Sequence, residues 1–181
     1  MLNMKDNDLI VIFRSKISEA LAKANWNFPV IQLEQPTLQG ANTESTVYFQ
    51  KLFDVPYGTA QRTKQWDAAN NVFNDTEEQA YETTFKVSAL IPQVPGDLSI
   101  PTPSDVVNYI QKYLSHRAII AQVNKLGFRI LRVTRVTNPY FTDDKSLMEA
   151  MPSFDIVITH SQSLTLTIPK IDRIEGKAYP V

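Results

Sequence analysis

Residues 81–91 read Tyr-Glu-Thr-Thr-Phe-Lys-Val-Ser-Ala-Leu-Ile, and this stretch sets the fold class of the chain. Between Tyr81 and Ala89 the odd-numbered positions are mainly apolar, whereas the even-numbered positions are polar or charged. Successive side chains of a β-strand point to opposite faces, so this alternation predicts a long strand with one buried face. Helices predicted on both sides of it in the sequence can cover that face, which indicates an α+β protein.

The helix predicted before this strand covers residues 8–25. Its apolar positions recur at spacings of three and four, which places them on one stripe that packs against a sheet. Asp8 is expected to be the N-cap. The stripe consists of Ile10, Phe13, Ile17, Leu21 and Ala24.

Two helices are predicted after the strand. Thr102, followed by Pro103 and by Asp105 three residues after the threonine, is typical of a capped helix start. Ser115 is expected to end this helix and to cap a shorter one over residues 118–126. Gly127 is a natural stop for that second helix. A strand is predicted over residues 128–136.

The other strand signals lie towards the two ends of the chain. Residues 29–35 and 46–53 are predicted strands, and turn-forming residues occupy positions 36–45 between them. Residues 153–168 are predicted to form one or two strands, with a break at 161–163. The remaining segments are a loop that begins at 138–141, a short helix over 142–150 and an irregular tail over 169–181. The expected fold is a single domain over residues 1–181 with an antiparallel or mixed sheet and helices on one face.

Residues 54–79 form a long polar stretch that we expect to project as a loop or hairpin, because such long loops are uncommon and often functional. Arg62, Lys64 and Trp66 within it fit a protein interface, a DNA contact or a plain exposed loop. Duplex DNA keeps its bases stacked, so a protein contact is favoured for the tryptophan. The candidate interface residues are Arg62, Lys64, Trp66, Tyr140, Phe141, Asp143 and Asp144.

The composition excludes several classes of protein. The 181 residues carry a formal net charge of −1, which argues against a protein that grips phosphate backbones. The chain has no cysteine, so it cannot form disulfides, zinc–thiolate sites or iron–sulfur clusters. Five glycines are too few and too scattered for a phosphate loop. The start shows no secretory signal, and its longest apolar run, 9–13, is far below the ~20 residues of a membrane span.

No residue pattern points to catalysis or to a bound metal. The chain has two histidines, His116 and His160, and lacks the G-x-S-x-G motif of a serine nucleophile. The acids Asp143, Asp144 and Glu149 match no calcium loop and fit a solvated helix start better. We expect neither an enzyme nor a cofactor.

Six short motifs follow one another along the chain. They are Val47-Tyr48-Phe49-Gln50-Lys51, Leu90-Ile91-Pro92-Gln93, Pro103-Ser104-Asp105-Val106-Val107, Gly127-Phe128-Arg129-Ile130-Leu131-Arg132-Val133, Asn138-Pro139-Tyr140-Phe141-Thr142-Asp143-Asp144 and Pro152-Ser153-Phe154-Asp155. In this order they resemble the neck or tail terminator proteins of tailed bacteriophages, also called gateway or tail-completion proteins. The resemblance covers roughly residues 8–168 and is weakest over 54–79.

The resemblance implies a structural virion protein that is assembled in the host cytoplasm. Such proteins form rings, often hexameric, that end the tail tube and join it to the head. The implied partners are further copies of the chain, the tail tube protein, a head–tail connector or collar protein, and the sheath if the tail is contractile. DNA would pass through the channel without specific binding, and no membrane is involved. The alternative is a head-side connector or neck adaptor ring, for which the resemblance implies twelve subunits.

Overall fold

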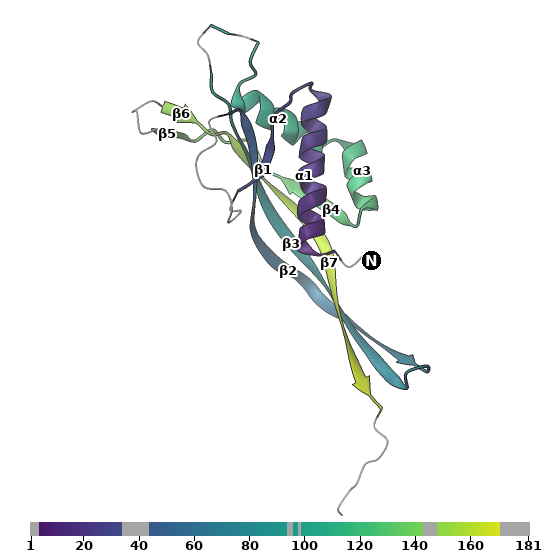
Figure 1. The fold of residues 1–181 in the computed structure, drawn as a ribbon. Helices are drawn as coiled ribbons and strands as arrows, with labels where there is room; N and C mark the ends of the chain where they lie inside the picture. Colours follow the sequence, from purple (N-terminus) through teal and green to yellow (C-terminus); the bar gives the residue numbers. More distant parts are fainter. Residues whose placement is uncertain (1–3, 34–43, 94–95, 98, 143–147, 171–181) are drawn as a thin grey trace, which may run out of the picture.

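A computed structural model describes residues 4–33, 44–93, 96–97, 99–142 and 148–170 (Figure 1). The helices within these residues are α1 (Asp6–Lys23), α2 (Pro103–Leu114) and α3 (Arg117–Lys125). The strands are β1 (Val30–Gln32), β2 (Thr46–Asp67), β3 (Val72–Leu90), β4 (Phe128–Val133), β5 (Tyr140–Thr142), β6 (Met148–Ala150) and β7 (Ser153–Pro169).

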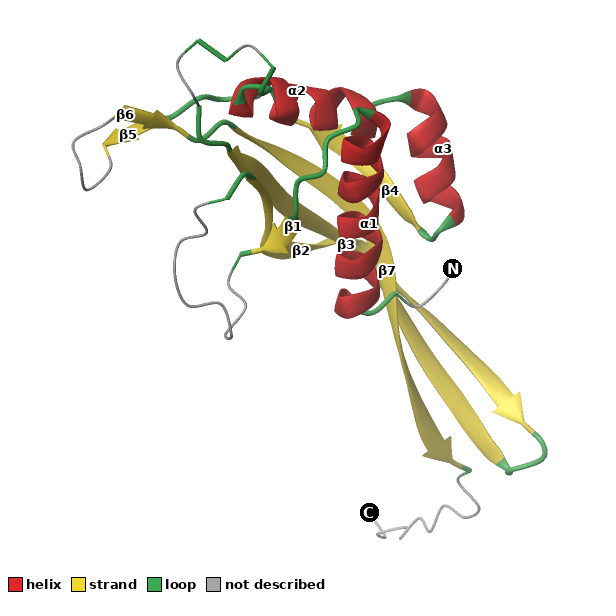
Figure 2. Cartoon of the chain, turned by 45° about the horizontal axis from the view of Figure 1, so that its top comes forward, coloured by secondary structure: helices red, strands yellow, loops and turns green. Residues whose placement is uncertain are grey.

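Five of these strands form one sheet in the order β1-β2-β3-β7-β4. β1 runs parallel to β2, whereas every other neighbouring pair in this sheet is antiparallel. β5 and β6 form a separate antiparallel pair. The helices pack against the sheet, as Figure 2 shows. The mixed sheet with its helical layer confirms the predicted α+β class.

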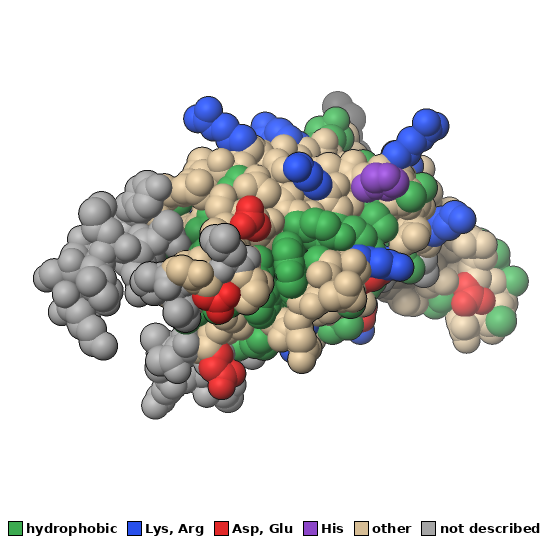
Figure 3. All heavy atoms as spheres, turned by 90° about the horizontal axis from the view of Figure 1, so that it is seen from above, with side chains coloured by type: hydrophobic (Ala, Val, Ile, Leu, Met, Phe, Trp, Pro, Cys, Tyr) green, Lys and Arg blue, Asp and Glu red, His purple; other side chains and the backbone are tan. Residues whose placement is uncertain are grey.

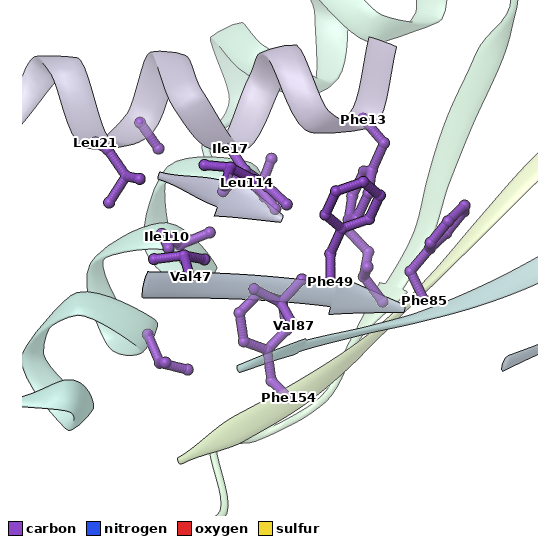
Figure 4. Close-up of a cluster of buried hydrophobic side chains, with 14 of the residues drawn as sticks. Phe13, Ile17, Leu21, Val47, Phe49, Phe85, Val87, Ile110, Leu114 and Phe154 are labelled. Carbon is purple, nitrogen blue, oxygen red and sulfur yellow. The ribbon is translucent and has the colours of Figure 1, made fainter. Parts of the chain in front are cut away.

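The core lies between the helices and the sheet, and three phenylalanines mark its centre (Figure 4). The rings of Phe13 on α1 and Phe85 on β3 stack with their centroids 4.6 Å apart. Phe49 on β2 meets Phe13 edge-on, with 5.9 Å between the centroids. Phe85, Val87 and Ala89 are all completely buried, which confirms the predicted buried face of residues 81–91.

Helix α1 begins two residues earlier than the sequence predicts. Lys5 is the N-cap, with an extended backbone and no side-chain capping bond, so the prediction of Asp8 as the cap is wrong. Asp6 and Asp8 both lie in the first turn, where a negative charge offsets the exposed N–H groups. Asp6 also pairs with Lys51 of β2, and this contact fixes the helix start against the sheet.

The starts of α2 and α3 use different caps. Thr102 and Asp105 form the predicted capping box at α2. At α3 the cap is His116, whose Nδ1 accepts from the backbone N–H of Ala118, so the prediction of Ser115 as the cap is wrong. The Ser115 hydroxyl instead donates to the Gln111 carbonyl at 2.8 Å and belongs to the end of α2. Gly127 follows α3 with a φ of 99°, as predicted for a helix stop.

Residues 54–79 form a hairpin of two long strands rather than an irregular loop. β2 and β3 pair from Thr46 opposite Leu90 to Asp67 opposite Val72. The connecting turn is held by Asp67, whose carboxylate accepts the N–H groups of Ala69 and Asn70. The predicted projection is confirmed, and Figure 1 shows the hairpin running past the end of α1. Its alternation was hard to see in the sequence because neither face of the hairpin is fully buried.

The C-terminal half differs from the predictions in three places. β7 is one strand without a break at residues 161–163, since all of these pair with β3. The segment 142–150 contains the end of β5 and strand β6 in place of a helix, and 143–147 lie outside the described residues. β4 ends at Val133, three residues before the predicted end. The irregular tail and the single domain over residues 1–181 stay predictions, because 171–181 also lie outside the described part.

Candidate interface on the projecting arm

The distal parts of β2, β3 and β7 extend past the helices as a three-stranded sheet, which we call the arm. It consists of residues 61–67, 72–79 and 162–169 (Figures 1 and 2). β3 and β7 pair without a register shift from Val72 opposite Pro169 to Ser88 opposite Ser153. The arm is therefore the direct continuation of the sheet that the helices cover, and the same side-chain alternation runs through both parts.

One face of the arm carries exposed apolar side chains. Trp66 lies opposite Phe73, with ring centroids 4.7 Å apart, and Phe73 lies opposite Ile168. Leu164 and Leu166 occupy the same face two and four residues before Ile168. Their exposed fractions are 40% for Trp66, 40% for Phe73, 38% for Ile168, 61% for Leu164 and 59% for Leu166. We call these five side chains the apolar face of the arm.

Two ion pairs lie on the same face of the arm as these apolar side chains. Arg62 Nε is 2.9 Å from Glu77 Oε2, and Lys64 Nζ is 3.8 Å from Asp75 Oδ2. Both basic side chains are well exposed, so each pair contributes at most about 1 kcal/mol to stability. Because each basic group faces an acid, the arm presents no concentrated positive field to a nucleic acid. On the body seen from above, basic side chains are likewise separated by uncharged ones (Figure 3).

The opposite face of the arm is polar and uncharged along most of its length. Thr63, Thr76 and Thr165 form one row across the three strands. The hydroxyls of Thr76 and Thr165 are hydrogen-bonded at 2.9 Å. Gln65 and Asn74 form the next row, with Thr167 beyond them. The arm is thus a two-sided sheet with one apolar face and one solvated face.

A polar network lies in the body at the base of the arm, where α1 begins. Lys51 forms ion pairs with Asp6 and Asp54. The Thr83 hydroxyl donates to Asp54 Oδ1 at 2.6 Å and lies 2.9 Å from His160 Nε2. Since the single hydroxyl proton goes to Asp54, His160 Nε2 must be the donor in the second bond.

This network assigns a structural role to His160. Its side chain is 3% exposed, and burial holds its pKa below the ordinary value. The bare Nδ1 has no hydrogen-bond partner among the described residues. Thr83 is already committed to Asp54, so the histidine has no proton to take from it as a nucleophile's base would.

Across the described ranges, no three His, Asp or Glu side chains gather in a way that could hold a metal. A groove at the base of the arm is lined by Tyr57, Glu82, Arg129, Leu131 and their neighbours, on several strands of the sheet. No α-helix in the described part is long and apolar enough to cross a membrane.

The structure brings together only part of the predicted interface. Arg62, Lys64 and Trp66 share one face of the arm. Tyr140 and Phe141 lie on β5, at the other end of the molecule (Figure 1). Asp143 and Asp144 lie outside the described residues.

Sequence reasoning missed Phe73 and the three aliphatic residues of β7. The alternation Leu-Thr-Leu-Thr-Ile at 164–168 was the signal that could have found the latter.

The fold and the arm define an α+β protein with a large uncovered sheet surface, which is typical of chains that assemble with others. The family model described as E217 gateway protein gp29 matches residues 8–170. The chain belongs to this family of phage gateway proteins.

Comparison with curated protein sequences gives no match. Among solved structures, the chain is similar to a sheath/tube terminator of an extracellular contractile injection system, PVC, in its extended state, determined by cryo-electron microscopy. The identity is 10% and the TM-score 0.49, and the alignment covers 100% of this chain and 65% of the terminator. The chain thus spans less than two thirds of that protein, and a TM-score this low supports no argument about function.

Proposed function

We propose that this chain is a structural virion protein that forms a ring, with six copies as the expected number, at the junction of tail and neck. The ring ends the tail tube and joins the tail to the head connector or collar, and leaves a central channel for DNA. Membership of the gateway family supports a structural role in the particle. The partners of the ring are the tail tube protein, the connector, and the sheath in a contractile tail.

The apolar face of the arm is the observation that carries this proposal. Five large side chains, each between 38% and 61% exposed, share one face of the arm beyond the helices. Covering them contributes on the order of 1 kcal/mol for each half-exposed side chain. As long as the chain is alone, this surface is exposed to water, so burying it against other chains is stabilising. Rings with cyclic symmetry are a usual form of assembly for identical chains.

The charge of the chain supports a channel through which DNA slides. The formal net charge is −1, and both basic groups on the arm's apolar face are paired with acids. A ring built from such chains lacks the strong positive field that would hold the phosphate backbone. DNA therefore passes without being gripped, as a connector between head and tail requires.

The ring is tested by measuring the mass of the purified protein by multi-angle light scattering, with and without tail tubes, and by imaging large species in negative stain. Rings of six copies on tube ends are the expected result. Rings of twelve copies on the head side would favour the connector alternative. Absence of the chain from both the tube end and the head connector would contradict the proposal.

The arm's part in joining is tested with Trp66→Ala. Because Trp66 lies on the apolar face and is half exposed, the variant should fold normally and join tails at least about tenfold less well. Gln65→Ala is the matched control, since Gln65 directly precedes Trp66 on the same strand and lies on the polar face. If both variants join tails to heads equally well, the apolar face is not part of the interface.

A further inference from the structure

The two outer edges of the arm differ in how they are protected from pairing with another strand. β2 pairs with β1 only at residues 47–49, so its later part forms one edge of the arm. Just before the arm, β2 has register shifts between Lys51 and Phe53 and between Tyr57 and Gln61 and contains Pro56. Within the arm this edge carries the charged residues Arg62 and Lys64. Bulges, proline and charged side chains are the usual devices that stop an edge strand from recruiting a partner.

The outer edge of β7 has none of these devices over residues 162–168, and Pro169 ends the strand. β4 covers β7 only at residues 156–160, and the N–H of Met4 bonds to the Ser161 carbonyl. Over the next part, 164–168, no strand among the described residues pairs with this edge. The sequence there is Leu-Thr-Leu-Thr-Ile, without charge, proline or register shift. Every second residue of such a strand directs its N–H and C=O groups outwards.

The alternation of this edge is complementary to itself. In an antiparallel pair, residues directly opposite each other lie on the same face of the sheet. If two copies of residues 164–168 pair about a two-fold axis at Leu166, Leu164 lies opposite Ile168 of the second copy. Thr165 lies opposite Thr167, and no charge is brought near another. Apolar residues then meet on one face and threonines on the other.

We propose that the free protein dimerises through this edge, with β7 of one copy pairing antiparallel to β7 of a second copy about Leu166. The result is a six-stranded sheet that joins two arms. It extends the apolar face of each arm and continues the row of threonine hydroxyls begun by Thr76 and Thr165. The uncharged edge favours this second copy over a charged partner segment.

The described parts of the two bodies do not obstruct this pairing. The last β7 residue covered by β4 is His160, six residues before Leu166. At about 3.3 Å per residue, each body lies roughly 20 Å from the two-fold axis, in opposite directions along the strands. The dimer covers an edge that otherwise invites aggregation while the chain awaits assembly.

Single cysteines test the register, because the chain has none of its own. Leu166→Cys places two thiols across the axis, at a Cα separation of about 4.5–5.5 Å that suits a disulfide. Mild oxidation should therefore give a linked dimer. Leu164→Cys should not, since its two thiols lie roughly 13 Å apart along the strands. Combining it with Ile168→Cys should restore the link. Linking by Leu166→Cys no faster than by Leu164→Cys would overturn the register and the proposal.

A charge at the axis tests the dimer without a covalent link. Leu166→Lys sets two ammonium groups opposite each other. The dimer dissociation constant measured by sedimentation should therefore be at least about tenfold higher than that of the wild type. Val11→Lys is the matched control, because Val11 is 65% exposed on α1 and does not belong to the arm. Circular dichroism and melting should be unchanged in both variants.

A wild type that is monomeric at all soluble concentrations would overturn the proposal. If in that case Leu166→Lys still blocked joining to tails, the edge would belong to a strand of another protein. The dimer is measured in the free protein and the ring on assembled particles, so either can fail without the other.

Discussion

β3 and β7 run through two regions of this molecule, the body beneath the helices and the arm beyond them. In the body, Phe85 and Ile156 are directly opposite each other and completely buried. In the arm, Asp75 and Leu166 are opposite each other on the same face, and Leu166 is 59% exposed. The strands, their register and their alternation do not change between the two regions. Only the helical cover ends, so the surface that makes the core of the body is exposed in the arm.

Truncating one phenylalanine in each region tests this difference most strongly. Phe85→Ala removes a ring that stacks on Phe13 in the core and should lower the free energy of unfolding by about 3–5 kcal/mol. Phe73→Ala on the arm removes a side chain that is 40% exposed and should cost less than about 1 kcal/mol. Urea unfolding followed by circular dichroism measures both. Similar losses would mean that the arm folds as part of the core.

His160, at the boundary between body and arm, gives a smaller, pH-dependent effect. Burial holds its pKa below the 6.5 of an exposed histidine, so the folded chain keeps it neutral where the unfolded chain takes up a proton. Stability from this group is complete above pH 6.5 and decreases as the pH falls below it. His160→Gln should flatten that part of the curve of stability against pH.

The matched control for this titration is His116→Asn, because asparagine is also a good N-cap and His116 caps α3 and is not part of the network. Thermal unfolding between pH 7.5 and 5 compares the three proteins. The assignment fails if His160→Gln keeps the full slope of the wild type while His116→Asn loses it.

The smallest effect is expected from the ion pair between Arg62 and Glu77. Both side chains are largely exposed, so Arg62→Ala should change the free energy of unfolding by less than about 1 kcal/mol. The effect should shrink further in high salt. A loss as large as that of Phe85→Ala would show that the arm depends on its charges for folding.

The sequence predicted best where the signal is local or where one face is fully buried. The capping box of Thr102 and Asp105, the stop at Gly127 and the strand over residues 81–91 all need only neighbouring residues. The first helix was also found, but Asp8 was given the role of cap because it is a good capping residue. The contact between Asp6 and Lys51, 45 residues apart, favours the earlier start, and no local pattern contains it.

The arm was predicted only as a projection. Residues 54–79 contain few apolar residues, and their pairing appears only when Trp66 is set opposite Phe73 and Lys64 opposite Asp75. Residues 161–163 looked like a break because Ser-Gln-Ser has turn-like chemistry. β3 holds them extended by pairing with each one. Arg62, Lys64 and Trp66 were named from the sequence, whereas Leu164, Leu166 and Ile168 join them only through β3.

By itself the sequence determined the α+β class, the capping box of α2, the helix stop at Gly127 and the face that each residue takes in the central strand. These depend on periodicity and on hydrogen bonds within a few residues. The tertiary structure decided that the sheet extends past its helices and that distant apolar residues share one exposed face. It also decided that the β2 edge of the arm carries charged side chains, whereas the β7 edge over residues 164–168 carries none. Those properties depend on which strands pair and where the helical layer ends, and these contacts join residues tens of positions apart.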